Sequence, residues 1–417
     1  MNAPSPRGAV EVISLGCRLN LSESEHLRAL LADTNAPLTV VNSCAVTQAA
    51  VRETRRAIRR ARRDRPEARI VVTGCAAEVE RAALAAMPEV DALVANTAKL
   101  DPAAWHRPAA PAIPRPAAHT RAPARLTAHT RAPARFTAHT RAFVTVQNGC
   151  DHACTFCVIP QGRGPSRSRP IAAVVAEIAA LADAGIAEVV LTGVDLTSWS
   201  DGGQSLGHLV RAILAAVPGL PRLRLSSLDG IEIDDALFDL LTHEPRVMPH
   251  VHLSLQHGAD LILKRMRRRH LRQDAVRLVE RLHAARPDIA IGADLIAGFP
   301  TETPAHHAEN LSIIRALPVV HGHVFPYSPR PGTPAARMPQ LPPPVIAARA
   351  AELRAAVAET RATWLHSLIG TPLSVLAERD GTGHAANFAR AKLPAGTPAG
   401  TLIDLTPTHI TEGLLAS

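Results

Sequence analysis

Three cysteines stand close together at Cys150, Cys154 and Cys157, separated first by three residues and then by two. Thiolates at this spacing suit an iron–sulfur cluster, because they can bind three irons of a four-iron cube and leave the fourth without a protein ligand. A structural zinc site instead closes its tetrahedron with a fourth ligand. His152 is the one nearby candidate for that ligand, but it lies inside the loop between two of the cysteines. The spacing therefore predicts a catalytic iron–sulfur cluster, with zinc or chance as the alternatives.

The other three cysteines, Cys17, Cys44 and Cys75, each follow an apolar run that predicts a strand, at 10–15, 38–41 and 69–72. Helical patterns separate these runs, and strand–helix alternation predicts a parallel sheet. The cysteines would then meet at the carboxyl edge of that sheet, where open α/β sheets bind ligands. We expect a second three-cysteine cluster site there. The alternative is three buried core cysteines.

Helices in this first part are expected at 22–32 and 48–63, with Ser22 and Glu25 forming a capping box at the start of the first one. After the cysteine loop, further strands are predicted at 143–147, 188–191, 222–225, 250–255, 289–296 and 321–325. Helices are predicted between them at 171–184, 206–217, 234–241, 272–285 and 304–317. Six such units indicate an open partial (β/α)6 barrel, whose functional residues belong at the carboxyl ends of the strands.

The chain of 417 residues is long enough for several domains. We expect an N-terminal α/β domain at 1–101, a linker at 102–140, a barrel domain at 141–368 and a short β-rich tail at 369–417. The linker region is rich in Pro, Ala, Arg and His, and it repeats ten residues at 118–127 and 128–137. This pattern predicts an extended linker of unknown role.

The formal net charge is +9, and most basic residues are arginines. Such a charge favours a polyanionic partner such as nucleic acid, although an Arg- and Ala-rich composition alone also produces it. The sequence has no run of eighteen apolar residues and no apolar signal core, so we expect a cytoplasmic protein with no membrane partner. We also expect a monomer. Six cysteines in a chain of this length also suit a reducing compartment.

The cysteine loop, with Phe156 before its third cysteine, resembles the cluster motif of radical S-adenosylmethionine (SAM) enzymes. The flanking strings at 141–150 and 157–168 are similar to those of the methylthiotransferases, most of all the branch that acts on threonylcarbamoyladenosine in tRNA. The blocks around Cys17, Cys44 and Cys75 also resemble that family's N-terminal domain. The tail is similar to its small RNA-binding TRAM domain, although it is short and has only Phe388 for stacking on bases.

The resemblance implies two [4Fe-4S] clusters, one on Cys150, Cys154 and Cys157 that binds and cleaves SAM, and one on Cys17, Cys44 and Cys75 that delivers sulfur. Further SAM contacts are expected from residues at the strand ends. These are Phe156, Gly193, Asp195, Ser226, Ser254, Gln256 and Gly298. Gly193 would let the backbone approach the ligand, and Asp195 would accept from the ammonium of SAM. Each residue taken singly is equally explained as a helix cap or a structural residue.

The basic residues near these sites suggest contacts with RNA. Arg163, Arg167 and Arg169 follow the cysteine loop and are placed to meet phosphates. The dense basic run at 264–270 is either a solvated helix face or a source of one arginine for SAM or RNA. An anticodon stem-loop is a suitable substrate, because unstacked loop bases can be splayed into a pocket.

The activity that the resemblance implies is addition of a 2-methylthio group to N6-threonylcarbamoyladenosine beside the anticodon (tRNA position 37). An electron donor such as flavodoxin or ferredoxin would reduce the SAM-cleaving cluster. Two alternatives remain open. A sister enzyme would act on isopentenyladenosine or on a ribosomal protein aspartate, and a noncatalytic RNA-binding protein would hold structural metals only.

Overall fold

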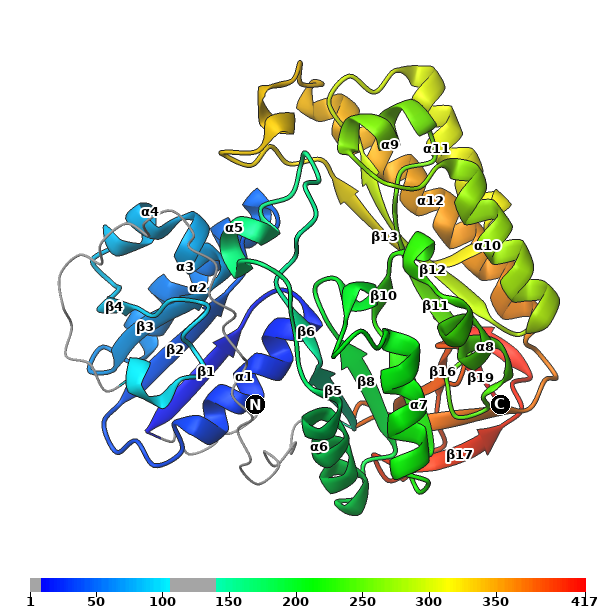
Figure 1. The fold of residues 1–417 in the computed structure, drawn as a ribbon, viewed down its shortest axis with the longest axis horizontal. Coiled ribbons are helices and arrows are strands. Elements are labelled where there is room, and N and C mark those ends of the chain that lie inside the picture. Colours follow the sequence, from blue (N-terminus) through cyan, green and yellow to red (C-terminus); the bar gives the residue numbers. More distant parts are fainter. Residues whose placement is uncertain (1–8, 106–139) are drawn as a thin grey trace. The chain divides into compact units, whose positions relative to one another are not determined.

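The computed structural model describes residues 9–105 and 140–417 of the chain (Figure 1). The repeats of the expected linker lie outside these ranges. The chain divides into two compact units. The first contains the described residues up to Trp105, together with Asn148–His152 and Cys157–Arg167. The second contains the described residues 140–147, Ala153–Phe156 and Ser168–Ser417.

The first unit is built on a parallel sheet with strand order β1-β2-β3-β4. Its strands are β1 (Val10–Ser14), β2 (Leu38–Ser43), β3 (Arg69–Gly74) and β4 (Ala92–Leu93). The helices are α1 (Arg18–Leu30), α2 (Gln48–Asp64), α3 (Cys75–Val79) and α4 (Arg81–Ala85), with a 3-10 turn η1 (Pro102–Ala104). Every residue of β2 is buried, as expected for a central strand of a parallel sheet.

Helix α1 begins earlier than the sequence suggests. Cys17 is its N-cap residue, so Ser22 and Glu25 lie inside the helix and the predicted capping box is wrong. The reason is a tertiary contact of Asn20, whose side-chain amide donates to Leu15 O at 2.7 Å and to Ser43 O at 3.0 Å. These bonds fix the first turn of the helix against the ends of β1 and β2.

The second unit contains the six parallel strand positions expected of a partial barrel. β5 (Arg141–Thr145), β8 (Glu188–Thr192) and β9 (Arg222–Leu225) form one sheet. β10 (Ser227–Leu228), β11 (His250–Gln256), β12 (Ala290–Ala297) and β13 (Val319–Pro326) form the next, in that order. The expected strands are therefore present, within a few residues at each end. The short elements at the cysteine loop are β6 (Gln147–Asn148), α5 (Ile159–Arg163) and β7 (Arg167–Ser168).

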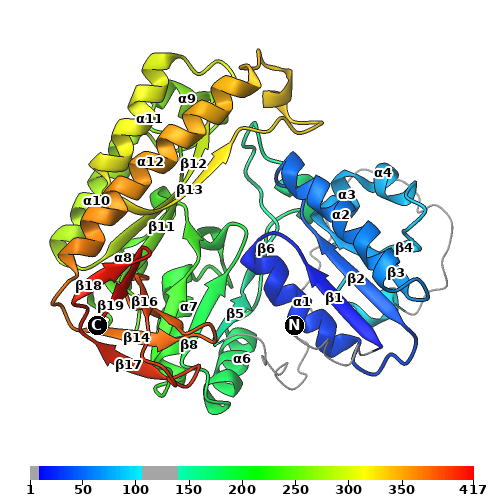
Figure 2. The same ribbon diagram turned by 180° about the vertical axis from the view of Figure 1, so that it is seen from behind.

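Helices cover the outer face of this curved sheet (Figure 1). They are α6 (Ile171–Asp183), α7 (Leu206–Ala216), α8 (Asp235–His243), α9 (Asp260–Met266), α10 (Arg272–Ala285), α11 (Pro304–Ala316) and α12 (Pro343–Ser367). The 3-10 turns described in this unit are η2 (Leu196–Ser198), η3 (Gly230–Glu232) and η4 (Pro334–Arg337). The reverse view shows α12 alongside α11 and β13 (Figure 2). None of the helices in the described ranges has the length and apolarity needed to cross a bilayer.

Strand periodicity divides the barrel into an apolar and a polar face. Val251, Leu253 and Leu255 of β11 belong to the main hydrophobic core. Because side chains alternate along a strand, His252 and Ser254 face the opposite side. The interior of the barrel therefore carries polar groups in the position where catalytic residues are expected.

The tail forms a mixed six-stranded sheet of order β17-β14-β15-β16-β19-β18. The strands are β14 (Leu373–Ala377), β15 (Thr382–Ala385), β16 (Arg390–Lys392), β17 (Leu402–Leu405), β18 (His409–Thr411) and β19 (Leu414–Ala416). The sequence predicts the first and fourth of these and misses the other four, which are three or four residues long.

Phe388 of the tail packs against the amino ends of the barrel strands. Its ring stacks on His250 of β11 with centroids 4.9 Å apart, and it also contacts His321 of β13 and His384. The Arg224 guanidinium lies 4.9 Å from the ring centroid. Phe388 is thus a packing residue between tail and barrel in this structure, and it is already occupied by stacking partners.

Candidate functional site

The three N-terminal cysteines stand at one edge of the first sheet. Cys17 follows β1, Cys44 follows β2 and Cys75 follows β3, where it begins α3. The three strands are parallel and adjacent, so their carboxyl ends share that edge. Cys17 is exposed, whereas Cys44 and Cys75 are buried.

Electrostatic effects between the thiols show that they are neighbours. Burial raises the pKa of Cys44 to about 11, and the thiols of Cys17 and Cys75 act in the same direction. Burial also raises the pKa of Cys75, and the positive charges of Arg163 and Lys99 oppose that rise. Ionisation of these buried thiols therefore requires a positive counter-charge, such as a metal centre supplies.

The separation of these thiols argues against a single metal ion. Among the described residues, their three sulfur atoms do not form a group of potential ligands within 4.8 Å of one another. One ion would need its ligands that close, whereas a four-iron cluster binds each thiolate through a different iron. This set of donors fits a cluster better than a zinc ion.

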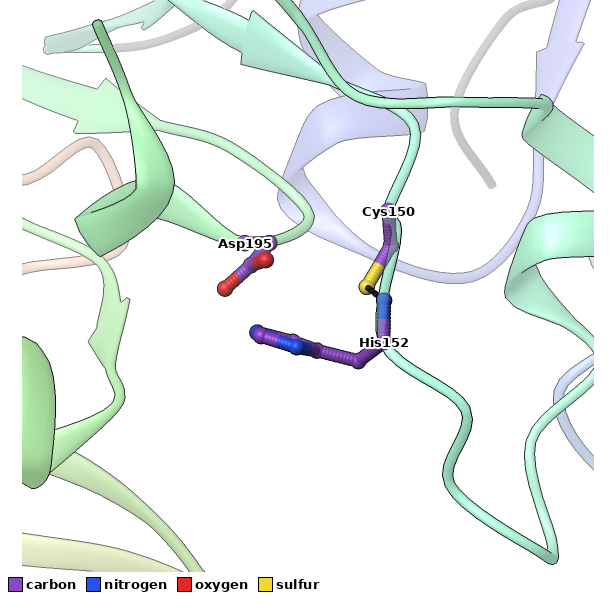
Figure 3. A group of neighbouring side chains, drawn as sticks. All are labelled: Cys150, His152 and Asp195. Carbon is purple, nitrogen blue, oxygen red and sulfur yellow. Dashed lines mark hydrogen bonds between the residues drawn. The ribbon is translucent and has the colours of Figure 1, made fainter. Parts of the chain in front are cut away.

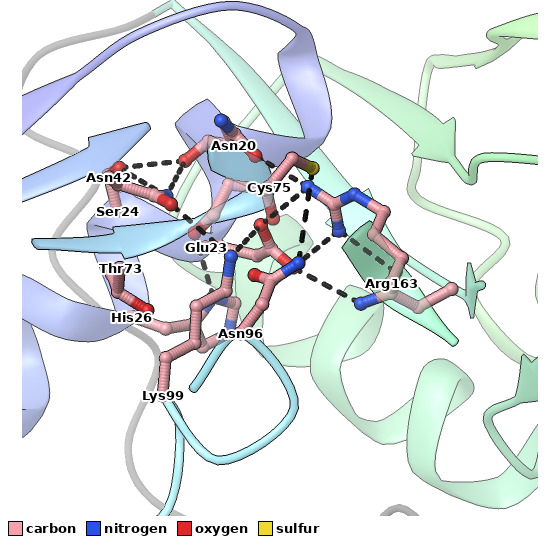
Figure 4. A network of polar contacts seen from close by, with 12 residues as sticks. Asn20, Glu23, Ser24, His26, Asn42, Thr73, Cys75, Asn96, Lys99 and Arg163 are labelled. Atoms are coloured by element: carbon pink, nitrogen blue, oxygen red, sulfur yellow. Dashed lines mark hydrogen bonds and ion pairs between the residues drawn. The ribbon is translucent and has the colours of Figure 1, made fainter. Parts of the chain in front are cut away.

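A network of buried charges lies beside Cys75 (Figure 4). Both oxygens of the Glu23 carboxylate accept from Arg163, at 2.9 Å and 3.1 Å, and one also accepts from Lys99 Nζ at 2.5 Å. The three side chains are only 1–2% exposed. Burial acts to raise the pKa of Glu23, but Arg163 and Lys99 outweigh it and lower that pKa to about 2. Glu23 is therefore a carboxylate held between two cations.

Amide side chains complete this network. Arg163 also donates to Asn20 Oδ1 at 2.5 Å and to Asn148 Oδ1 at 2.9 Å. The Asn96 amide donates to Gly162 O at 2.6 Å and lies 3.9 Å from Cys75 Sγ. Gly162 also packs closely against Cys75, because a β-carbon on Gly162 would lie 3.2 Å from Cys75 Cβ. Helix α5, which follows the cysteine loop in sequence, is thus fixed beside Cys75.

Arg163, which the sequence predicts as a phosphate contact, is buried in this structure. Its guanidinium is bound by Glu23 and two amides and is closed to solvent, so it cannot reach RNA phosphates in this structure. Arg167 is half-buried and donates to the Pro165 and Arg163 carbonyls. Arg169 pairs with Glu177 at 2.6 Å and donates to Thr145 O.

The cysteine loop follows β6 and precedes α5. In the first unit, the backbone N–H of His152 donates to Cys150 Sγ at 3.4 Å (Figure 3). The N–H of Ile159 donates to Cys157 Sγ, also at 3.4 Å. In the second unit, Arg268 Nη1 lies 3.7 Å from Cys154 Sγ. N–H groups directed at sulfur favour the thiolate form, which is the form that binds iron.

The middle of the loop is anchored in the second unit by Thr155 and Phe156. Thr155 N–H and Oγ1 donate to Met266 O at 3.1 Å and Arg265 O at 2.8 Å. The Phe156 ring packs edge-on against Phe299, with centroids 6.4 Å apart. Phe156 is therefore placed to hold the loop.

The residues expected to contact SAM lie in the second unit, most of them at strand ends, and their neighbours differ from one residue to the next. Gln147 Oε1 accepts from the N–H groups of Val194 and Asp195, both at 2.9 Å, and a β-carbon on Gly193 would lie 3.0 Å from the same oxygen. This bond fixes the turn after β8 that carries Asp195, which is also labelled in Figure 3.

The next two expected residues, Ser254 and Ser226, differ in their hydrogen bonding. Ser254 Oγ lies 2.9 Å from Ser227 Oγ in the barrel interior. The Ser226 hydroxyl is buried and has no hydrogen-bond partner among the described residues. An unpaired buried hydroxyl is costly, so Ser226 has capacity to bind a ligand group.

The last two expected residues have unusual backbone conformations. Gln256 ends β11 with a positive φ of 73°, a rarely occupied region for a non-glycine residue. Gly298 has φ of 72°, and a β-carbon there would lie 2.7 Å from Ile346 Cγ1 of α12. Its N–H donates to Glu302. Gly298 therefore packs closely against α12, in addition to its expected role of letting the backbone approach SAM.

Arg268 is the member of the basic run that enters the barrel. Its guanidinium donates to Asp229 Oδ2 at 3.0 Å and to Ser254 O at 2.8 Å, in addition to its contact with Cys154. Arg269 pairs with Asp229 and Glu232 near the surface. Arg268 is thus the arginine of this run that lies beside a cysteine of the loop.

Sequence reasoning missed a polar cluster in the barrel interior. Asp294 Oδ1 of β12 lies 3.0 Å from His252 Nε2 of β11 and 3.1 Å from His323 Nδ1 of β13. Asp294 Oδ2 also accepts from Ser227 at 3.3 Å. The available signal was strand alternation, since these residues occupy inward positions on neighbouring strands.

Two family models match the chain. Residues 144–312 match the radical SAM superfamily, and residues 9–95 match the uncharacterized protein family UPF0004. Among solved structures, the chain resembles the radical SAM methyltransferase TsrM from Kitasatospora setae with a TM-score of 0.54. The match has 19% identity and covers 76% of this chain and 66% of that one. A likeness to the radical SAM enzyme OxsB has a TM-score of 0.52 at 10% identity, over 84% and 56% of the two chains. These likenesses show the fold.

Similarity in sequence extends over almost the whole chain. The tRNA-2-methylthio-N(6)-dimethylallyladenosine synthase of Cereibacter sphaeroides is 37% identical over 388 residues, covering 88% of this chain and 86% of that protein. The threonylcarbamoyladenosine tRNA methylthiotransferase MtaB of Rickettsia prowazekii is 39% identical over 409 residues, covering 97% and 96%. The chain therefore belongs to the radical SAM methylthiotransferase family.

Proposed function

We propose that this enzyme adds a 2-methylthio group to N6-threonylcarbamoyladenosine beside the anticodon of tRNA. The observation that carries the proposal is the 39% identity to a threonylcarbamoyladenosine tRNA methylthiotransferase across nearly the full length of both chains. The two sets of three cysteines, one at a sheet edge and one in the loop after β6, supply the ligand types that two clusters require.

In this proposal Cys150, Cys154 and Cys157 hold one [4Fe-4S] cluster, and Cys17, Cys44 and Cys75 hold the other. Bound SAM and the first cluster would supply radical chemistry that removes hydrogen from an unactivated C–H bond. The backbone N–H groups of the loop stabilise the thiolate ligands, and Arg268 adds a positive charge next to Cys154.

The residues at the carboxyl ends of the barrel strands would orient the SAM molecule. The Gln147 side chain fixes the turn that presents Asp195, whose carboxylate would accept from the ammonium of SAM. Ser226, Ser254 and Gln256 would meet the remaining polar groups of SAM, and Gly193 and Gly298 would allow the backbone to approach. Arg167 and Arg169 would contact the phosphates of the RNA. Their present hydrogen bonds would rearrange when the RNA binds.

The domains, the RNA partner and the electron donor are proposed from membership of the family. The domains are taken as 1–101, 141–368 and 369–417, with 102–140 as the linker, and the anticodon stem-loop is the RNA partner. A flavodoxin- or ferredoxin-type donor would supply electrons, and the enzyme would act as a cytoplasmic monomer. The 37% identity to a dimethylallyladenosine-specific synthase keeps that substrate as the second candidate.

The test uses the reconstituted enzyme, SAM, a reductant and three matched anticodon stem-loops, carrying threonylcarbamoyladenosine, isopentenyladenosine or unmodified adenosine. Digested products are analysed by mass spectrometry. We expect a methylthio adduct on the threonylcarbamoyl substrate. Preferential modification of the isopentenyl substrate would select the second candidate, and SAM cleavage with no adduct on any RNA would overturn both.

A further inference from the structure

The Glu23, Lys99 and Arg163 network has one more positive charge than negative charge. Two cations share a single carboxylate, and all three side chains are 1–2% exposed. A buried charge without a counter-charge is costly, so the surplus cation requires an anion nearby. Further hydrogen bonds of the three side chains are made with the neutral amides of Asn20, Asn42 and Asn148.

The sheet-edge cysteines supply such an anion when they are ionised as metal ligands. The pKa of Arg163 is raised chiefly by Glu23 against the effect of burial, and the thiols of Cys75 and Cys17 act in the same direction. Burial lowers the pKa of Lys99, and the charges of Glu23 and Cys75 oppose that effect. The network and the sheet-edge cysteines are therefore electrostatic neighbours, connected by the Asn96 amide between Gly162 O and Cys75 Sγ.

The surplus positive charge of the network is opposite in sign and equal in amount to the charge of a cluster on three thiolates. Three thiolate ligands carry one more negative charge than an oxidised [4Fe-4S] core carries positive charges. We propose that Arg163 and Lys99, held by Glu23, are positioning residues that supply the counter-charge of the N-terminal cluster and raise its reduction potential. This inference rests on the proposed function, because it requires that Cys17, Cys44 and Cys75 hold a cluster.

The physical basis is the low dielectric of the buried site. Reduction adds one electron, and hence one negative charge, to a cluster that is already anionic. A fixed positive charge nearby stabilises the reduced form more than the oxidised form, because Coulomb interactions are strong where water is excluded. Arg163 lies only six residues after Cys157 in sequence, so the loop that carries one cluster also supplies charge to the other site.

The experiment measures the midpoint potential of the N-terminal cluster alone. The full chain carries Cys150→Ala, Cys154→Ala and Cys157→Ala, is reconstituted anaerobically, and is titrated with dithionite while the reduced cluster is followed by electron paramagnetic resonance. Arg163→Gln and Lys99→Gln each remove a positive charge, and Glu23→Gln removes a negative one. Arg163→Lys keeps the charge and serves as the matched control.

We expect the potential to fall in Arg163→Gln and in Lys99→Gln, to rise in Glu23→Gln, and to change least in Arg163→Lys. A purely structural role would not give shifts of opposite sign, because all three charge removals disturb the same network. Shifts in one direction, or none, in variants that retain about four irons per chain would overturn the inference and leave the proposed function intact. Absence of iron from the parent chain would refute the N-terminal cluster, and with it the proposed function.

Discussion

Gly16 packs directly against Cys44: a β-carbon on Gly16 would lie 2.6 Å from Cys44 Cβ and 2.8 Å from its sulfur. Gly16 also has φ of 93°, which strains any other residue. The turn after β1 therefore uses a glycine to bring Cys17 alongside Cys44. Side-chain bulk at this point would displace a proposed cluster ligand.

We predict that Gly16→Ala destabilises the protein by roughly 1–3 kcal/mol and removes iron from the N-terminal site while SAM cleavage is retained. Urea unfolding and iron analysis measure the two effects. Gly202→Ala is the control, because Gly202 has φ of 59° but nothing within 4 Å of its β-carbon position. Equal iron loss in the two variants would show that contact with Cys44 is not the cause.

The interior carboxylate Asp294 predicts an acid-sensitive contribution to stability. Burial acts to raise its pKa, but hydrogen bonds and charge from His252 and His323 outweigh burial and lower the pKa from its ordinary value of 3.8. A carboxyl whose pKa is lower in the folded chain stabilises the fold above its unfolded pKa, and this contribution is lost as the pH falls below it.

The measurement is the free energy of unfolding of the iron-free chain between about pH 6 and pH 3. We expect the difference between wild type and Asp294→Asn to shrink as the pH falls below about 4. Asp239→Asn is the control, since that carboxylate pairs with His243 at the surface and is 64% exposed. A difference that is constant with pH would refute a titrating role for Asp294.

A buried ion pair supports the barrel at the amino ends of its strands. Arg224 contacts both oxygens of Glu188, at 2.9 Å and 3.1 Å, and neither side chain is exposed. Removing one partner leaves a buried charge uncompensated, so Glu188→Gln should destabilise the chain by about 3–5 kcal/mol. Glu359→Gln, which breaks a surface pair with Arg315, should change stability by less than about 1 kcal/mol. Similar losses in both variants by urea unfolding would contradict this account.

The packing of Phe388 gives a prediction about the tail. Phe388→Ala should lower the free energy of unfolding by about 3 kcal/mol, because it removes the stacking on His250 and the contact with Arg224. Affinity for the anticodon stem-loop should stay within about twofold of wild type at a temperature where both are folded. Weaker RNA binding at unchanged stability would instead assign Phe388 to base stacking.

Local patterns of apolar residues correctly predicted most strands of the two α/β parts of the chain. The strands that precede Cys17, Cys44 and Cys75 are short apolar runs, and the parallel order of a strand–helix repeat then brings the cysteines to one edge. The barrel strands were visible for the same reason. Most of the three- and four-residue strands of the tail were missed because so few residues carry little periodicity; β17 is the exception.

The features that depend on distant partners were not predictable in this way. Arg163 looked like an RNA contact because it stands in a basic segment, but it binds Glu23, which is 140 residues away in sequence. His252, Asp294 and His323 come from three strands, and no spacing in the chain marks them as neighbours. The start of α1 was misplaced because Asn20 is fixed by Ser43 of another strand.

The most direct test of the account is the iron and acid-labile sulfide content per chain after anaerobic reconstitution. Wild type is compared with a Cys17→Ala, Cys44→Ala, Cys75→Ala variant. Two four-iron clusters predict about eight irons in wild type and about four in the variant. About four irons in both proteins would contradict the N-terminal cluster and the sulfur-insertion function that depends on it.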